Sequence, residues 1–376
     1  MRKLNRRAVI RRFTTIVLLL IILAAVAGCN GTPGSETDRK AITGTTHTVT
    51  VTDTLGRQVK VPARIERIAC LCPFSGDAAV MLGQGDKIVA VIGGLKREVL
   101  LTEICPAVKS AAVPRVSGTI NIEELIRCDP DVVFVKNDTA LNEAEVDKLN
   151  RAGLTFVVVD FRSMEEQRYA MRLMGQVLGA SEEAEEYNRY YESCLERVRK
   201  VVEQIPAEQR VRVYHSLNEA TRTDYTQSLP ADWTQAAGAI NVSVNQQLKL
   251  VENEYYATLE QILQWDPDVI ICNEPATLDY IMSNEQWSPL KAVKSRKVYL
   301  MPIGVSRWGH FSSLETPLAV LWTAKTLYPD RFRDLDMVAE TKFFYRQFFD
   351  LELSDEMVSQ ILSGEGLRLP KQAEAK

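Results

Sequence analysis

Histidine is scarce in this chain of 376 residues, which contains only His47, His215 and His310. A site for a bare zinc or manganese ion usually needs several imidazoles together with a carboxylate. His47 lies in a segment that is typical of a flexible tether, so two imidazoles remain for the folded part. We therefore expect no resident metal or cofactor. His215 and His310 are weak metal-ligand candidates, which could complete the shell of a metal already held by a small chelator.

Short motifs that mark common catalytic sites are also missing. The sequence contains no G-x-S-x-G, no P-loop, no H-E-x-x-H and no glycine-rich dinucleotide fingerprint after a strand. Its closely spaced acid pairs, Asp129 with Asp131 and Asp266 with Asp268, flank Asp-Pro steps that are typical of turns. These absences predict a protein that binds a ligand without turning it over, and not an enzyme.

A basic surface is missing from the folded part. Six basic side chains and no acid lie in the first 28 residues, so removing six positive charges from the net charge of −4 leaves −10 for the rest. A surface of that sign binds polyanions poorly, which argues against nucleic acid as a partner.

The longest apolar run covers residues 16–27 and follows the basic stretch. It is too short to cross a bilayer comfortably, but it suits the core of an export signal. The run ends in Val26-Ala27-Gly28-Cys29, which resembles the lipobox of bacterial lipoproteins, where Cys29 would be acylated and become the mature N-terminus. An ordinary signal peptide with a cysteine at its boundary by chance is the alternative.

We expect a lipoprotein signal peptide at 1–28 and a flexible tether at 29–47, because the latter is rich in Gly, Ser and Thr and has no apolar periodicity. The folded part would then be exported and anchored by lipid to the cell membrane. The outer face of the plasma membrane and the periplasm are equally open. The six other cysteines sit mostly in apolar runs, which favours buried free thiols over disulfides.

Short β-branched runs alternate with helical patterns after the tether. Buried strands are predicted at 67–71, 87–91, 131–135 and 155–159, with helices at 76–82, 122–127 and 142–151. Such alternation indicates an α/β lobe with a mainly parallel sheet, which we place at 48–162.

The pattern then changes to helices alone, at 163–206. One helix runs to Leu178, Gly179 breaks it, and a second starts at Ser181 with acidic residues in its first turn and basic residues in its last. Strands return at 211–214, 268–271 and 297–301, with helices at 314–328 and 355–362. We place a second α/β lobe at 207–365 and a tail at 366–376.

The two lobes share an internal repeat. Residues 120–135 read INIEELIRCDPDVVFV and residues 257–272 read ATLEQILQWDPDVIIC. Each copy opens with a capping-box pattern, Asn121 with Glu124 and Thr258 with Gln261, and then turns at Asp-Pro into a buried strand. The repeat predicts two related Rossmann-like lobes joined by a long backbone helix, with a ligand cleft between them.

The lipobox, the tether and several segments of the folded part together resemble one known family. Those segments are 51–57 (VTDTLGR), 68–73, the Asn-Ile-Glu-Glu-Leu and Asp-Pro-Asp-Val stretches, and 287–298 (WSPLKAVKSRKV). The chain resembles the helical-backbone (class III) substrate-binding lipoproteins of ABC importers, which capture iron-siderophore complexes, cobalamin and haem. The resemblance covers nearly all of residues 48–362.

The resemblance implies a lipid-anchored binding component that captures a metal chelate and delivers it to an ABC permease with its cytoplasmic ATPase. A ferric siderophore is the favoured ligand, then cobalamin or haem, and we expect a monomer. A surface ligand sensor or a lipid-anchored hydrolase is the alternative. In the family, one glutamate on each lobe docks onto permease arginines. The matching residues here are Glu123 and Glu260, although the helix dipole alone also favours acids there.

Ligand contacts are expected from loops that follow strands. The run from Ser306 to His310 combines a planar donor, a large aromatic ring and an imidazole, so Arg307 would suit a carboxylate or oxyanion and Trp308 a flat apolar face. A surface turn with Trp308 folded into the core is the alternative. The full set of expected ligand-binding residues is Cys72, Pro73, Phe74, Asn137, Tyr225, Trp233, Arg307, Trp308 and His310.

Overall fold

The computed structural model describes residues 47–369. The expected signal peptide, Cys29, most of the tether and residues 370–376 lie outside the described residues. Among residues 47–369, no helix has both the length and the apolar character that crossing a membrane requires.

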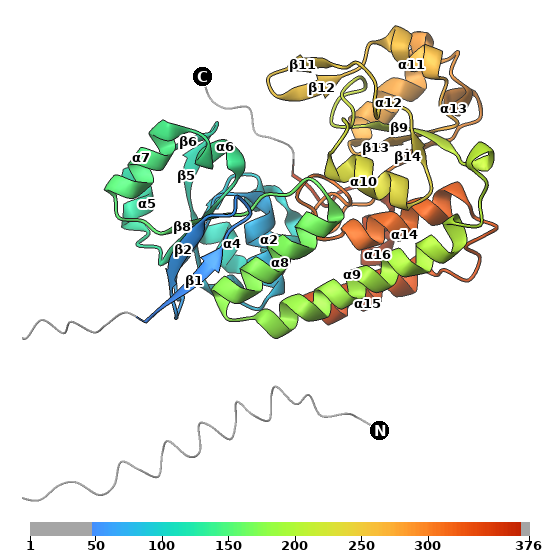
Figure 1. The fold of residues 1–376 in the computed structure, drawn as a ribbon. Helices are drawn as coiled ribbons and strands as arrows, with labels where there is room; N and C mark the ends of the chain where they lie inside the picture. The colour runs from blue at the N-terminus through green and yellow to red at the C-terminus, as the bar shows by residue number, and fades with distance from the viewer. Residues whose placement is uncertain (1–46, 370–376) are drawn as a thin grey trace, which may run out of the picture. The chain divides into compact units, whose positions relative to one another are not determined.

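The N-terminal lobe is built on a six-stranded sheet in the order β6-β5-β4-β3-β7-β8 (Figure 1). All neighbours pair in parallel except β5 and β6. Strands β3 and β7 are entirely buried, as continuous apolar runs in parallel sheets should be. The strands are β3 (Ile68–Cys70), β4 (Ile88–Ile92), β5 (Ala112–Val116), β6 (Thr119–Ile120), β7 (Val132–Val135) and β8 (Phe156–Val158).

Helices and one hairpin complete this lobe. An antiparallel hairpin, absent from the expectations, precedes the sheet and consists of β1 (Thr48–Thr52) and β2 (Gln58–Pro62). The helices are α2 (Pro73–Met81), α3 (Val99–Ile104), α4 (Pro106–Ser110), α5 (Ile122–Arg127), α6 (Asn137–Ala140) and α7 (Glu143–Arg151).

Two long helices follow, α8 (Met164–Leu178) and α9 (Ser181–Val202). Gly179 ends α8 with φ of 69°, a left-handed conformation that glycine adopts without strain, and this is the expected break. Helix α9 packs against both α8 and α14 (Thr316–Leu327), and α14 is part of the C-terminal lobe. It therefore runs beneath both lobes as a continuous backbone (Figure 1).

The C-terminal lobe has a parallel four-stranded sheet in the order β10-β9-β13-β14. The expected mixed α/β architecture with mainly parallel sheets is thus confirmed. Its strands are β9 (Arg212–Ser216), β10 (Ile240–Asn241), β13 (Val269–Cys272) and β14 (Val298–Leu300), with a separate hairpin of β11 (Lys249–Val251) and β12 (Glu254–Tyr256). Its other helices are α10 (Leu229–Ala236), α11 (Leu259–Trp265), α12 (Pro275–Ser283), α13 (Lys291–Lys294), α15 (Met337–Phe349) and α16 (Asp355–Ser363).

The internal repeat is also a repeat of hydrogen bonds. Asp131 accepts from the backbone N–H of Arg67 at 2.8 Å, and Asp268 accepts from that of Arg212 at 3.0 Å. Arg67 directly precedes β3 and Arg212 is the first residue of β9. Their side chains donate to the carbonyls of Cys128 and Trp265, at the C-terminal ends of α5 and α11. The same aspartate therefore ties the same two chain segments together in each lobe.

The capping boxes of the two copies differ. Thr258 and Gln261 form a complete box. Asn121 caps its helix by accepting from the N–H of Glu124, but its own N–H donates to the carbonyl of Pro114 and not to Glu124. The expectation of a full box in the first copy is therefore wrong, because the antiparallel turn of β5 and β6 supplies the partner instead.

The six cysteines of the described part of the chain are free thiols. Five are buried and Cys128 is half-buried, as their apolar sequence surroundings suggest. The five buried cysteines therefore pack as small apolar side chains.

Removing the repeated carboxylates tests the modular design. We expect Asp131→Ala and Asp268→Ala each to lower the free energy of unfolding by about 1 kcal/mol, because backbone N–H groups lose an acceptor. The losses should add in the double variant, since the sites lie in different lobes. Urea unfolding followed by circular dichroism measures them.

Asp147→Ala is the control, because Asp147 is exposed and forms only an i,i+4 pair with Arg151. Its effect should stay within about 0.5 kcal/mol. Equal effects of all three single variants would contradict a structural role for the repeated aspartates.

Candidate ligand-binding site

The loop that follows β14 is held in place by one buried carboxylate, Glu315. One of its oxygens accepts hydrogen bonds from the N–H of Ser306 at 3.0 Å and the hydroxyl of Tyr345 at 2.9 Å. The other accepts from the hydroxyls of Ser306 at 2.7 Å and Ser313 at 3.1 Å. Burial raises the pKa of Glu315 above its usual value, and these hydrogen bonds oppose that rise.

Two glycines let other side chains approach this loop closely. A Cβ on Gly304 would lie 1.6 Å from the Tyr345 hydroxyl oxygen, so only glycine fits there. Gly309 has φ of 65° and its carbonyl accepts from the indole N–H of Trp233 at 2.7 Å. Close packing at Gly304 and Gly309 therefore constrains the loop that carries Arg307 and His310.

A small cavity of about 70 Å³ lies between the lobes at this loop. Pro73, which begins α2 after β3, and Gly94, in the loop after β4, line its N-terminal side, and Arg307 and His310 line its C-terminal side. The cavity therefore sits where the carboxyl ends of two parallel sheets face each other, the usual ligand position in such folds. Its other lining residues are Asp77, Leu95, Glu98, Ser306, Ser312, Ser313 and Arg368.

Arg307 is the central cation of the cavity. The residue is 9% exposed, and its guanidinium forms an ion pair with Glu274 and donates to the side chain of Asn218. A second guanidinium nitrogen lies 3.0 Å from Nε2 of His310. Burial lowers the pKa of Arg307, with Glu274 opposing that effect.

His310 is neutral in this environment. Its burial, followed by the positive charges of Arg307, Arg222 and Lys136, holds its pKa well below the usual value. Because an arginine can only donate, Nε2 of His310 accepts from Arg307 and the ring proton resides on Nδ1. His310 can therefore offer one N–H donor to a ligand.

Two carboxylates of the N-terminal lobe also line the cavity. Glu98 forms an ion pair with Arg368, and one of its carboxylate oxygens is buried without a hydrogen-bond partner. Asp77 is 1% exposed and one of its oxygens is likewise unpartnered. Burial, with the nearby charge of Glu315, raises the pKa of Asp77 well above its usual value, which favours the neutral carboxyl.

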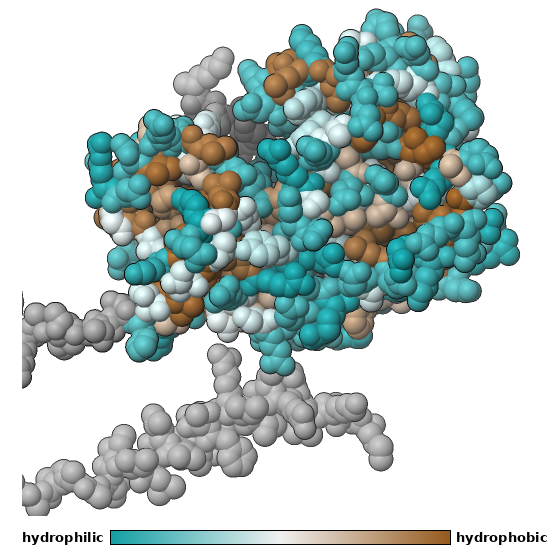
Figure 2. Space-filling view, viewed as in Figure 1, coloured by the Kyte–Doolittle hydropathy of each residue, from teal (hydrophilic) through white to brown (hydrophobic). Residues whose placement is uncertain are grey.

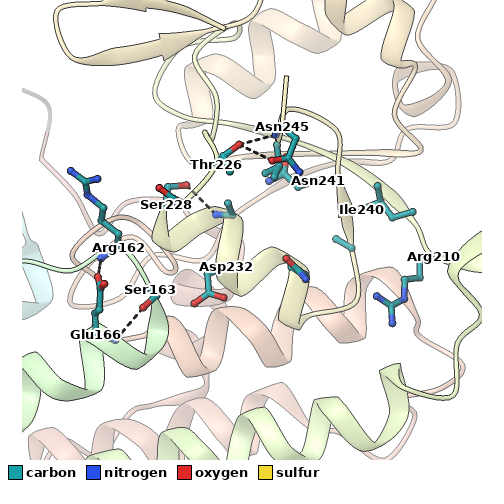
Figure 3. Close-up of a pocket in the computed structure, with 15 residues that line it drawn as sticks. Arg162, Ser163, Glu166, Arg210, Thr226, Ser228, Asp232, Ile240, Asn241 and Asn245 are labelled. Carbon is teal, nitrogen blue, oxygen red and sulfur yellow. Dashed lines mark hydrogen bonds between the residues drawn. The ribbon is translucent and has the colours of Figure 1, made fainter. Parts of the chain in front are cut away.

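Wider hollows lie beside the lobe junction. One of about 660 Å³ includes Asn137, and another of about 840 Å³ runs along α10 and the edge strand β10. The two hollows share Arg162, Ser163 and Glu166 at the start of α8. Figure 3 shows that the side chains of the larger one are mostly polar and spread along an open groove from Arg162 to Arg210. They do not converge, so the small interlobe cavity is the better-organised site despite its size.

The expected ligand-binding residues divide into two groups. Pro73, Arg307 and His310 line the interlobe cavity, Asn137 lines the 660 Å³ hollow, and Tyr225 stacks on Tyr255 with ring centroids 4.3 Å apart. The other four are buried core side chains, so in this structure they support the loops and present no face to the cavity: Cys72, Phe74, Trp233 and Trp308. For Trp308 this is the arrangement given above as the alternative.

His215 does not belong to a cluster of metal ligands in the described part of the chain. Its Nδ1 lies 3.0 and 3.1 Å from the two oxygens of Asp224, and its buried Nε2 has no partner. Among residues 47–369, no group of three or more His, Cys, Asp or Glu side chains could hold a metal ion. The residues that sequence reasoning missed are Asp77, Glu98 and Arg368, for which no local motif gives a signal.

Glu123 and Glu260 occupy equivalent exposed positions. Each is the second residue of its helix, α5 or α11, one on each lobe. Both helices lie on the side of the lobes away from α9 (Figure 1). The backbone N–H of Glu260 and the side chain of Thr258 lower the pKa of Glu260, which keeps it charged.

Two α/β lobes on a helical backbone, with a site closed between them, define a two-lobed solute-binding protein. Comparison with known proteins agrees: a family model described as "Periplasmic binding protein" matches residues 68–303. The chain belongs to the periplasmic binding protein family, and its fold is of the class III type. Its relatives are substrate-binding components of ABC transporters and not enzymes, which confirms the expected class.

Individual relatives differ in the ligands that their names state. The molybdate-binding protein MolA of Haemophilus influenzae is 26% identical over 321 residues, covering 80% of this chain and 90% of MolA. The vitamin B12-binding protein of Vibrio cholerae is 23% identical over 243 residues, 64% of this chain and 82% of that protein. The solved structure of MolA with molybdate has a TM-score of 0.74 at 24% identity and covers 81% of this chain and 99% of MolA.

The buried carboxylate that holds the loop can be tested by Glu315→Gln. The amide nitrogen would replace one accepting oxygen, so two donors would lose their partner in a dry site. We expect the free energy of unfolding to fall by about 2–4 kcal/mol. The exposed Glu352 provides the control, Glu352→Gln. Equal unfolding midpoints for the two variants in urea would show that Glu315 does not hold the loop.

Proposed function

We propose that this protein is the lipid-anchored substrate-binding component of an ABC importer. It captures a small metal oxyanion of the molybdate type between its lobes and passes it to the permease. The family, and the likeness to MolA over most of both chains, support the transport role. The lipobox-like run at Cys29 supports the anchor.

The observation that carries the oxyanion proposal is the size and chemistry of the interlobe cavity. Its volume of about 70 Å³ is far below the ~300–1,000 Å³ of sites for drug-sized ligands, and a water occupies ~30 Å³. Arg307, the N–H of His310 and the hydroxyl of Ser312 are donors that oxygen atoms of an anion accept, whereas the hydroxyl protons of Ser306 and Ser313 already go to Glu315. Glu274 and Asn218 hold Arg307 until a ligand oxygen replaces them.

A metal chelate is the second candidate, with a ferric siderophore ahead of cobalamin or haem. The aromatic stack of Tyr225 and Tyr255, which Phe311 extends, offers a flat apolar surface near the lobe junction. The adjoining hollows of about 660 and 840 Å³ have room for such a ligand. Relatives named as B12-binding and iron-uptake proteins keep this candidate in view.

Calorimetric titration of a soluble form that starts at Asn30 distinguishes the candidates. The panel contains molybdate, tungstate, sulfate, phosphate, ferric siderophores, haem and cobalamin. We expect saturable binding of molybdate or tungstate. Binding of a chelate alone would overturn the oxyanion proposal, and silence across the panel would overturn both candidates and favour a sensor of another ligand.

Arg307→Gln should weaken oxyanion binding strongly. A charge-assisted hydrogen bond contributes about 1.5–3 kcal/mol, so the dissociation constant should rise by about 10- to 100-fold. Arg307→Lys keeps the charge but not the fork of donors, and we expect an intermediate loss. Arg199→Gln, on the exposed face of α9, is the matched control and should bind as the unchanged protein does. Unchanged affinity in Arg307→Gln would exclude the cavity as the site.

Docking of the permease is proposed to use Glu123 and Glu260. Exposed apolar side chains accompany them, Ile126 and Leu141 on the N-terminal lobe and Leu250 on the other. In Figure 2 brown side chains gather over the β11–β12 hairpin and over the region of α5 and α6, whereas α8 and α9 are covered by hydrophilic ones.

Continuity of α9 between the lobes implies small tilts of the lobes when the ligand is released, because no loop hinge separates them.

Replacing both glutamates tests this surface. Glu123→Gln with Glu260→Gln should abolish ligand uptake in cells while leaving calorimetric affinity unchanged, because neither side chain lines the cavity. Glu182→Gln with Glu356→Gln is the control, since both are exposed acids in first helical turns on other faces. A loss of affinity in the first pair would place these residues at the ligand.

A further inference from the structure

The last described residues return from the C-terminal lobe to the N-terminal lobe. Helix α16 ends at Ser363 and is capped by Gly364, and residues 365–369, which we call the strap, then pair with residues 97–99. The N–H of Val99 donates to the carbonyl of Leu367 at 3.1 Å, and the N–H of Leu369 donates to that of Arg97 at 2.9 Å. Leu367 is buried. Residues 366–369, the described part of the expected tail, therefore belong to a backbone-paired crossing between the lobes.

Gly364 sets the direction of the strap. Its φ is 73°, and a Cβ there would lie 2.5 Å from the carbonyl oxygen of Met301, at the start of the ligand loop. Any other residue would push the strap away from that loop. The turn thus anchors the crossing beside the cavity.

Arg368 places its charge inside the cavity wall. It forms an ion pair with Glu98, and its charge also acts on Asp77. Its side chain is 16% exposed, and burial lowers its pKa to about 10. This enclosure means that water screens the interaction only weakly.

Without the guanidinium of Arg368 the cavity would repel an anion. Glu98 and Asp77 each have one buried oxygen without a hydrogen-bond partner, and both line the same cavity as Arg307. An unpaired Glu98 carboxylate there would compete for Arg307 and repel ligand oxygens.

We infer that Arg368 is a specificity-determining residue of the interlobe cavity: carried there by the strap, it neutralises Glu98 and so allows the cavity to accept an anion. The ligand half of this inference rests on the proposed oxyanion function. The structural half, that the strap joins the lobes, stands on backbone hydrogen bonds alone.

Removing the charges of the pair, singly and together, tests the ligand half. Arg368→Gln should raise the dissociation constant of molybdate or tungstate by about tenfold or more. Glu98→Gln combined with Arg368→Gln should recover most of the affinity, because the carboxylate that Arg368 neutralises is gone. Glu98→Gln alone should bind at least as tightly as the unchanged protein.

Failure of the double variant to recover affinity would mean that Arg368 acts only through folding, and would overturn the charge role. Equal affinity of Arg368→Gln and the unchanged protein would overturn it as well. If the unchanged protein binds no anion, the proposed function fails, and the ligand half of this inference fails with it.

Hydrogen–deuterium exchange tests the strap without any ligand. A chain that ends at Gly364 should exchange its amides at 97–101 at least tenfold faster than one that ends at Leu369, which retains the strap. Equal exchange in the two truncated chains would show that the strap does not join the lobes. This outcome is independent of whether an oxyanion binds.

Discussion

The arrangement of the ligand loop and the helices that join the lobes depends on one constraint, the buried carboxylate of Glu315. Its four donors come from the ligand loop and from α15, so a charge that is costly to bury is satisfied only when these parts meet. The neighbouring carbonyl of Leu314 accepts from Tyr187 on α9, and that of Ser313 from Gln167 on α8. Loop, backbone helices and C-terminal helices are thereby fastened at one point.

The lobes themselves follow a simpler plan, used twice. A half-buried aspartate at an Asp-Pro turn, Asp131 or Asp268, ties the start of one strand to the next, and the helix before it ends in a left-handed residue, Asp129 or Asp266. What differs between the lobes lies at the carboxyl ends of the sheets. The N-terminal lobe contributes glycine and proline backbone with two acids, and the C-terminal lobe contributes Arg307 and His310. The repeated segments thus form the scaffold of both lobes, and the residues that differ between the lobes form the site.

Local features were predictable from the sequence because they have local causes. Periodicity, caps and Gly179 locate the repeat, the two backbone helices and seven strands within a residue or two, but not β5, β6 and β10. Helix α15 and the hairpins were not predicted, since their aromatic or polar residues give no clear period. In the site, Arg307 and His310 follow a strand and could be proposed. Arg368 could not, because its partner Glu98 is 270 residues away along the chain and no pattern links them.

The free thiols described above set the redox behaviour of the folded chain. An exported protein usually meets oxidants, and small exported domains often depend on disulfides for their stability. Here the two lobes bury enough apolar surface that six cysteines between residues 70 and 272 serve as packing. The described fold therefore does not depend on disulfide formation, and reductants should not change its unfolding midpoint.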